Sequence, residues 1–279
     1  MIIALLRLMR LYYSLPLAGG FIVIVFYLVG GNVTHIYKQL VLSFLSLSGI
    51  ISAAYVYNDV CDVDIDEINC PNRMLPCGKI NRKTALLWSI VLFIAGFVFA
   101  ALCNWKFFSF MCIIGIALIF YDIFSKRIGI FKDILVASLM TSLYPLAFTL
   151  TDSIQTVRLK VLFIHPLWLF LTSLGYEMLK DIRDFKGDRK INSPAIADYS
   201  PKKSFLYISQ IIIVTASLIT PLPFVLGYCK KIYLLASIGA IILAILSTRK
   251  KPTIAIRYIY AEVFLITAGS VVDLLVFGP

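Results

Sequence analysis

Long apolar runs alternate with short polar segments along the whole chain, and this pattern predicts the fold. A helix that crosses a lipid bilayer needs about 20 mostly apolar residues. The runs that come close to this length cover residues 14–30, 40–57, 84–103, 106–122, 134–150, 160–179, 204–226, 231–247 and 257–277. We therefore predict an all-α fold, a bundle of about nine transmembrane helices around a central cavity, with residues 1–279 forming a single membrane-embedded domain.

The segment before the first run, MIIALLRLMRLYYSL, predicts a short helix that lies at the membrane interface. Arg7 and Arg10 interrupt its apolar residues, and no small-residue cleavage site follows them. Both features are unlike a signal peptide. We expect this helix to lead into the first membrane span.

Composition and charge agree with a membrane protein and add an orientation. The chain is 60% hydrophobic and 15% charged, and its formal net charge is +11. Cytoplasmic loops of membrane proteins carry an excess of Lys and Arg. With the N-terminus in the cytoplasm, 20 of the 26 Lys and Arg fall on that side and 6 on the other. The charge therefore predicts a multi-pass protein of the cell membrane, and it requires no nucleic-acid partner.

The acidic residues concentrate in two short windows on the predicted cytoplasmic side. Five of the 15 lie in residues 59–67, and four lie in residues 177–188. The first window contains DVCDVDID and the second contains DIRDFKGD, so both place aspartates at positions i, i+3 and i+7. The aspartates at these positions are Asp59, Asp62, Asp66, Asp181, Asp184 and Asp188.

This spacing puts each set of three carboxylates on one face of a helix that continues past the membrane edge, where their charges repel. A solvated surface explains one such run, but two runs with the same spacing indicate cations between them. Mg²⁺ binds in proteins through carboxylates, waters and substrate phosphates. We therefore predict Mg²⁺ sites that receive a phosphorylated ligand. Asp64 and Glu67 fall outside this pattern, and we expect them at the surface.

Basic residues near the two motifs are candidates for binding phosphate oxygens. They are Arg73, Lys79, Lys126, Arg127 and Lys180. A diphosphate held by Mg²⁺ is a good leaving group, because the metal neutralises the charge that develops on it. An apolar bundle would accept a hydrocarbon tail and keep water from a carbocation. Together these features predict transfer of a prenyl group from a prenyl diphosphate to a lipophilic acceptor.

The same residues resemble the UbiA superfamily of intramembrane prenyltransferases. Its NDxxDxxxD signature matches residues 58–66, its DxxxD signature matches residues 184–188, and its central Tyr/Lys segment is similar to residues 121–127. The resemblance implies that both motifs bind Mg²⁺ and diphosphate. It also implies further contacts with the diphosphate, from Asn58, Arg73, Tyr121, Lys126 and Lys180.

The sequence identifies the acceptor substrate less specifically than the type of reaction. Residues 177–188, EMLKDIRDFKGD, resemble the second motif of the archaeal digeranylgeranylglyceryl phosphate synthases. This resemblance favours geranylgeranyl as the prenyl group and geranylgeranylglyceryl phosphate as the acceptor. An aromatic or quinone precursor of the homogentisate, hydroxybenzoate or naphthoate type remains open. A divalent-cation transporter is a third interpretation, since acids within membranes often mark ion paths.

Overall fold

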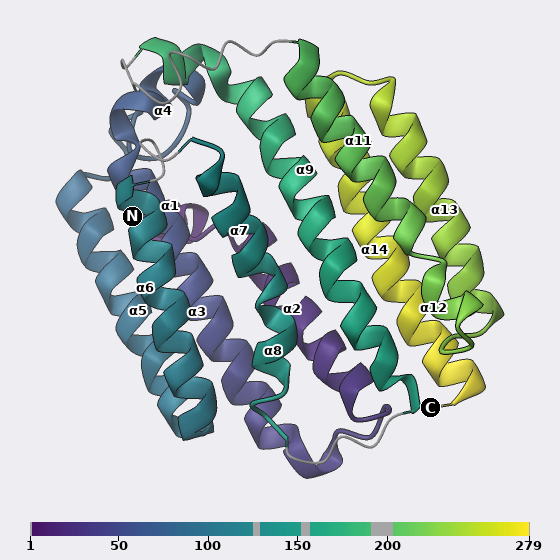
Figure 1. Cartoon of the computed structure of the whole chain (residues 1–279). Coiled ribbons are helices and arrows are strands. Elements are labelled where there is room, and N and C mark those ends of the chain that lie inside the picture. The colour runs from purple at the N-terminus through teal and green to yellow at the C-terminus, as the bar shows by residue number, and fades with distance from the viewer. Residues whose placement is uncertain (1, 125–128, 152–156, 191–202, 279) are drawn as a thin grey trace. The chain divides into compact units, whose positions relative to one another are not determined.

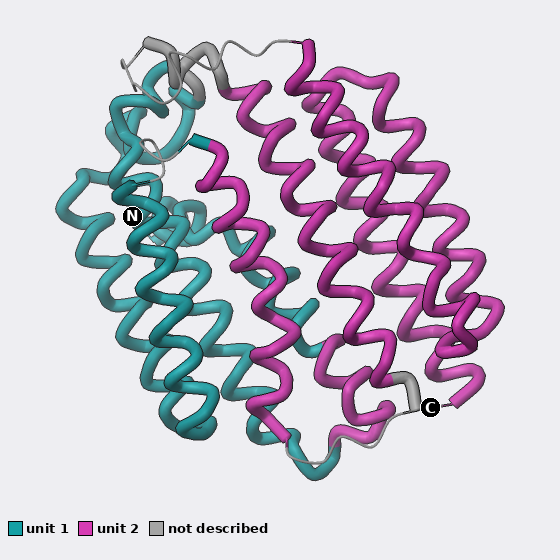
Figure 2. Tube along the Cα trace, viewed as in Figure 1, with its two compact units in different colours: residues 1–22, 34–129, 186–197 teal, residues 23–33, 130–185, 198–279 magenta. Residues whose placement is uncertain are grey.

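The computed structural model describes residues 2–124, 129–151, 157–190 and 203–278, and all regular elements in these ranges are helices (Figure 1). The chain divides into two compact units (Figure 2), and each is described by itself. Unit 1 contains residues 1–22, 34–129 and 186–197. Unit 2 contains residues 23–33, 130–185 and 198–279.

Unit 1 is built around three long helices that pack side by side, α3, α5 and α6 (Figure 1). Its elements are α1 (Ile2–Leu8), the first part of α2 (Leu11–Leu28), η1 (Thr34–Ile36), α3 (Tyr37–Cys61), α4 (Val63–Asn69), α5 (Arg82–Cys103) and α6 (Trp105–Phe124). The short helix α1 confirms the helix predicted before the first span. Its Leu8 packs with Val56 of α3, Ala85 of α5 and Leu75 of the connecting segment, so α1 and that segment share one core.

Unit 2 contains the remaining helices. Its elements are the rest of α2, α7 (Phe131–Thr141), α8 (Leu143–Ala147), η3 (Val157–Lys160), most of α9 (Val161–Lys190), α11 (Lys203–Ile219), α12 (Leu222–Val225), α13 (Lys231–Thr248) and α14 (Pro252–Phe277). Helix α13 packs along both α11 and α14. A core of Leu179, Ile213, Ala244 and Ile259 joins α9 to these three helices.

Within the described residues, eight segments are long and apolar enough to cross a membrane. Of the nine predicted runs, the one that differs covers residues 134–150. It forms two shorter helices, α7 and α8, with a break at Ser142. Pro145 supplies the reason. A proline within a helix donates no backbone hydrogen bond, and its ring clashes with the carbonyl four residues earlier, here that of Thr141. The run predicted as a single span is therefore divided into two shorter helices.

The long helices also carry apolar side chains on their outer faces. On α5, Leu87, Ile94 and Leu102 lie on one face and expose 63%, 59% and 61% of their surface. Large apolar surfaces are rare on soluble monomers and mark contact with lipid or another protein. In a helix of this length and hydropathy, the face suits the hydrocarbon of a bilayer.

One buried acid in the last long helix has a structural role. Asp273 accepts hydrogen bonds from the backbone N–H groups of Lys230, at 2.8 Å, and of Tyr233, at 3.2 Å. Backbone N–H groups at the start of a helix have no partner within it, and a negative charge is favourable there. Asp273 thus caps α13 from α14, which accounts for an acid in a membrane span without an ion path.

Helices α3 and α5 approach each other closely at two glycines, Gly49 and Gly96. A Cβ atom on Gly96 would lie 2.6 Å from Cγ1 of Ile50, 3.0 Å from the Ile50 backbone nitrogen and 3.1 Å from the carbonyl oxygen of Ser46. Small residues allow such backbone contact between membrane helices, where packing drives association. The contact holds α3, which carries the first aspartate motif, against α5.

We expect Gly96→Ala to lower the free energy of unfolding by about 1–3 kcal/mol, because the added methyl group overpacks this contact. Gly20→Ala is the matched control, since a Cβ on Gly20 has no atom within 4 Å. Thermal unfolding in detergent compares the two variants. Equal melting temperatures for both would contradict the close approach.

Candidate active site

The first aspartate motif lies in unit 1, where α3 ends and α4 begins. The prediction of one continuous helix is wrong here, because α3 ends at Cys61 and Asp62 links the two helices with φ −102° and ψ 11°. A negatively charged side chain interacts unfavourably with the helix dipole at a C-terminus and favourably at an N-terminus. The break places Asp64 and Asp66 in the first turn of α4, where that interaction is favourable.

Arg73 brings the two outer aspartates of this motif together. Its Nη1 lies 3.4 Å from Oδ1 of Asp59, and it forms a short ion pair with Asp66. Both carboxylates are only 4% exposed. Burial raises the pKa of Asp66 above its ordinary value, and the Arg73 guanidinium offsets part of that rise. Arg73 thus binds two of the three carboxylates of the motif, and its contact with a diphosphate stays a prediction.

A second cation, Arg10, reaches the same carboxylate from the turn between α1 and α2. It pairs with Asp59, and its guanidinium carbon lies 5.2 Å from the centre of the Tyr55 ring. Its φ of +46° lies in the left-handed region, which costs a non-glycine residue about 1–3 kcal/mol. The ion pair and the ring contact offset this strain. The sequence placed Arg10 only in an interfacial helix, because nothing in its local pattern pointed to Asp59.

A further carboxylate, Asp122 of α6, joins the central part of the motif. Asn58 donates one hydrogen bond to Oδ1 of Asp122, at 3.0 Å, and another to Oδ2 of Asp62, at 3.2 Å. Asp122 is 6% exposed, and its Oδ2 has no hydrogen-bond partner in the described part of the chain. Asp122 was missed as a site residue from the sequence, although an acid inside an apolar span was a visible signal.

The second aspartate motif lies on α9, which continues without a break to Lys190. All three aspartates therefore belong to one helix, as predicted. Asp181 forms an ion pair with Lys132 of α7, and Arg183 donates to Asp184 at 2.7 Å. The side chain of Asp188 lies outside the described residues.

Another acid that was missed from the sequence lies beside this motif in unit 2. Asp133 of α7 is 1% exposed, and neither of its oxygens has a hydrogen-bond partner among the described residues. It interacts electrostatically with Asp181, Glu177 and Lys132. The only sequence signal was an acid at the start of an apolar helix, which also fits an ordinary helix N-terminus.

The remaining residues singled out from the sequence differ in how far the structure describes them. Lys180 pairs with Glu177 at 2.9 Å, one turn before Asp181. Tyr121 is half-buried in the last turn of α6, directly before Asp122. Lys126 lies outside the described residues. Asp64 and Glu67 are exposed, which confirms the prediction that they belong to the surface.

The chemistry of the donors fits Mg²⁺. Within the described residues, no three His, Cys, Asp or Glu side chains converge on one point that could hold a metal ion. The available donors are nevertheless carboxylate oxygens, which Mg²⁺ prefers. In unit 1, the unpartnered Oδ2 of Asp122 is a buried acceptor that a cation would satisfy.

Comparisons with known proteins agree with this interpretation. The sequence model of the UbiA prenyltransferase family matches residues 18–255. The digeranylgeranylglyceryl phosphate synthase of Saccharolobus solfataricus is 35% identical over 218 residues, which cover 78% of this chain and 76% of that protein. The chain is an integral, multi-pass membrane enzyme. It belongs to the UbiA prenyltransferase family, which confirms the resemblance of its motifs.

Two solved structures share the fold. A UbiA homologue from Aeropyrum pernix K1 has a TM-score of 0.76 at 18% identity, over 95% of this chain and 98% of that one. A UbiA homologue from Archaeoglobus fulgidus, bound to GPP and Mg²⁺, has a TM-score of 0.68 at 17% identity, over 97% of this chain and 99% of that one. The all-α membrane fold predicted from the apolar runs is therefore confirmed.

We expect Asp122→Asn to change the free energy of unfolding without Mg²⁺ by no more than about 1 kcal/mol, because the amide oxygen still accepts the hydrogen bond from Asn58. The same change should reduce the further stabilisation that added Mg²⁺ gives. Melting temperatures with and without Mg²⁺ measure both effects, and Asp64→Asn, at an exposed carboxylate, is the control. An unchanged response to Mg²⁺ in Asp122→Asn would contradict this role.

Proposed function

We propose that this protein transfers a geranylgeranyl group from its diphosphate to the hydroxyl group of geranylgeranylglyceryl phosphate. The hydroxyl oxygen bonds to C1 of the prenyl chain, the bond from C1 to the diphosphate oxygen breaks, and the hydroxyl proton passes to solvent. One observation carries the proposal. Two buried carboxylates, Asp59 and Asp66, are gathered by Arg73 at the end of a membrane helix, which gives metal donors and an anion-binding cation in one place.

The carboxylates that would hold Mg²⁺ are Asp59, Asp62, Asp66, Asp181, Asp184 and Asp188. When bound, the metal neutralises negative charge on the leaving diphosphate. The GPP and Mg²⁺ in the Archaeoglobus fulgidus homologue support this use of the motifs. Asp122 would join the first set through Asn58, which it shares with Asp62.

The cationic side chains would bind the diphosphate itself. Arg10 and Arg73 present guanidinium groups at Asp59, and a guanidinium can donate two parallel hydrogen bonds to phosphate oxygens. Tyr121, Lys126 and Lys180 would add donors. Before substrate binds, Arg10 and Arg73 pair with the carboxylates of the first motif, which reduces the repulsion between those carboxylates.

The acceptor assignment rests on the relatives. The Saccharolobus solfataricus protein and others of similar identity are digeranylgeranylglyceryl phosphate synthases, and the chain spans about three quarters of their length. We further propose that the N-terminus and both motifs face the cytoplasm. The distribution of Lys and Arg, 20 against 6, supports this orientation.

Asp62→Ala and Asp184→Ala are each expected to lower turnover by about 100-fold or more, because each removes a carboxylate that would hold Mg²⁺ at the leaving diphosphate. The assay follows radiolabelled geranylgeranyl diphosphate into lipid product by thin-layer chromatography. Asp64→Ala is the matched control at an exposed aspartate. Full activity of either variant, or of the wild type in excess EDTA, would refute the proposed function.

A panel of acceptors tests the second half of the proposal. Purified protein receives the same diphosphate with geranylgeranylglyceryl phosphate, homogentisate or 4-hydroxybenzoate in parallel. We expect product only with the glycerol phosphate ether. Product with an aromatic acceptor alone would instead assign the protein to the aromatic branch.

The orientation has its own test. Cys77 is exposed in the segment that follows the first motif. We expect a membrane-impermeant maleimide to label it in inside-out vesicles and not in intact cells, with Cys77→Ser as the control for other thiols. Labelling from the outside of intact cells would reverse the topology.

A further inference from the structure

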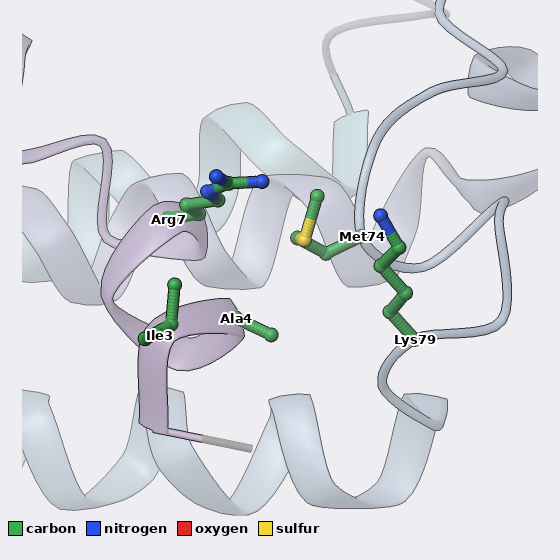
Figure 3. A pocket seen from close by; sticks show the side chains of 5 residues that line it. All are labelled: Ile3, Ala4, Arg7, Met74 and Lys79. Atoms are coloured by element: carbon green, nitrogen blue, oxygen red, sulfur yellow. The ribbon is translucent and has the colours of Figure 1, made fainter.

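A small hollow lies in unit 1, between α1 and the segment that follows α4. It has a volume of about 280 Å³ and is lined by five side chains (Figure 3). Ile3, Ala4 and Arg7 come from α1, and Met74 and Lys79 come from the segment. The lining therefore combines an apolar wall with two cations.

The backbone explains why these side chains meet. Ile3, Ala4 and Arg7 lie within one turn of α1, so they share a face of the helix. In the segment, Gly78 has a φ of +71°, the N–H of Lys79 donates to the carbonyl of Met74 at 3.0 Å, and that of Gly78 to Leu75 at 2.9 Å. This is the Schellman arrangement, which sets the first and last residues of the turn beside each other.

Two residues that line the hollow also pack against the hydrophobic core of unit 1. Ala4 and Met74 pack against the core that α1 shares with α3 and α5. Their positions are therefore fixed by the fold, and only the ends of Arg7 and Lys79 are free to adjust to a ligand. Such a wall is preformed, which lowers the ordering cost of binding.

Among the described residues, the two cations that line the hollow differ from the arginines that bind the first motif. Arg10 and Arg73, close by in the chain, are both paired with Asp59. In the described part of the chain, the Arg7 and Lys79 side chains form no ion pair or hydrogen bond. A ligand that matches this lining has an anionic head with at least one and a half negative charges and an apolar part beside it, which describes a phosphomonoester lipid.

The hollow is also linked along the chain to the two cations that bind the first motif. Arg7 lies three residues before Arg10, so their Cα atoms are at most about 11 Å apart. Met74 directly follows Arg73, which binds Asp59 and Asp66. Two separate stretches of chain thus tie the hollow to the first aspartate motif.

We propose that Arg7 and Lys79 bind the phosphate of the acceptor lipid, with its glycerol and first methylene groups against Ile3, Ala4 and Met74. This inference rests on the proposed function and adds the site that selects a phosphorylated acceptor. It places the acceptor phosphate next to the diphosphate-binding cations while leaving Asp59 and its partners to the prenyl donor.

The test compares geranylgeranylglyceryl phosphate with geranylgeranylglycerol, which lacks the phosphate, using the full-length protein in lipid nanodiscs. Arg7→Ala and Lys79→Ala should each raise KM for the phosphorylated acceptor about tenfold, the loss expected for one hydrogen bond to a charged group. The kcat, the KM for the prenyl diphosphate and the KM for the unphosphorylated acceptor should stay as in wild type. Lys83→Ala, at an exposed cation outside the hollow, is the matched control.

Charge-preserving changes guard against misfolding. Arg7→Lys and Lys79→Arg should keep most of the affinity, whereas both alanine variants should lose it at an unchanged melting temperature. If Arg7→Ala and Lys79→Ala bind and use the phosphorylated acceptor as Lys83→Ala does, the inference is wrong.

Equilibrium binding of the phosphorylated acceptor without any prenyl diphosphate separates this inference from the proposed function. Quenching of tryptophan fluorescence is a suitable signal, because Trp88 packs against the core under the hollow. Binding that depends on Arg7 and Lys79, in a protein that transfers no prenyl group to any acceptor, would overturn the proposed function and keep the phosphate site. Prenyl transfer that does not depend on Arg7 or Lys79 would keep the proposed function and overturn the phosphate site.

Discussion

Ion pairs between arginines and the buried aspartates of the first motif govern how unit 1 is built. Asp59 and Asp66 lie at the end of a membrane helix with 4% of their surface exposed, where an unpaired charge is costly. Arg73 and Arg10 reach them from two different stretches of chain. Each pair therefore fixes a local fold as well as a charge. The turn after α1 and the segment after α4 both have to bring a guanidinium to the same carboxylate.

The packing of α1, α3 and α5 also positions the carboxylates and arginines of the first motif. The close contact at Gly96 packs α5 against α3, the helix that ends at the first motif. The core shared by α1, α3 and α5 also includes Leu8 and Leu75, which lie two residues from Arg10 and Arg73 in the chain. An enzyme that binds a diphosphate needs carboxylates for the metal and cations for the phosphate close to each other. The ion pairs between these carboxylates and cations must therefore be able to break when the ligands bind. Ion pairs that a metal and a phosphate can replace meet both needs, because the incoming ligands offer each partner an equivalent interaction.

Not every buried acid in the membrane region belongs to this chemistry. Asp273 caps α13, and Glu262 accepts a hydrogen bond from the indole of Trp168 at 3.1 Å, far along the chain from both motifs. Asp122 and Glu262 each keep one carboxylate oxygen without a hydrogen-bond partner among the described residues, and Asp133 keeps both. The neighbours of these acids separate the two groups. Asp122 shares Asn58 with Asp62, and Asp133 interacts with Asp181, whereas Glu262 binds the Trp168 indole and Asp273 caps α13.

The class of fold and the two motifs follow from the sequence alone. Apolar runs of sufficient length must be helices in a bilayer, because backbone polar groups there have no water to bind. Paired aspartates at equal spacing are a local pattern, so the sequence is enough to single out Asp59, Asp62, Asp66, Asp181, Asp184 and Asp188. Tertiary packing, in contrast, decides that α3 stops at Cys61 and that Arg10, Asp122 and Asp133 join the motifs. Contacts between residues far apart in the chain depend on how helices pack, and no periodicity in the sequence records that packing.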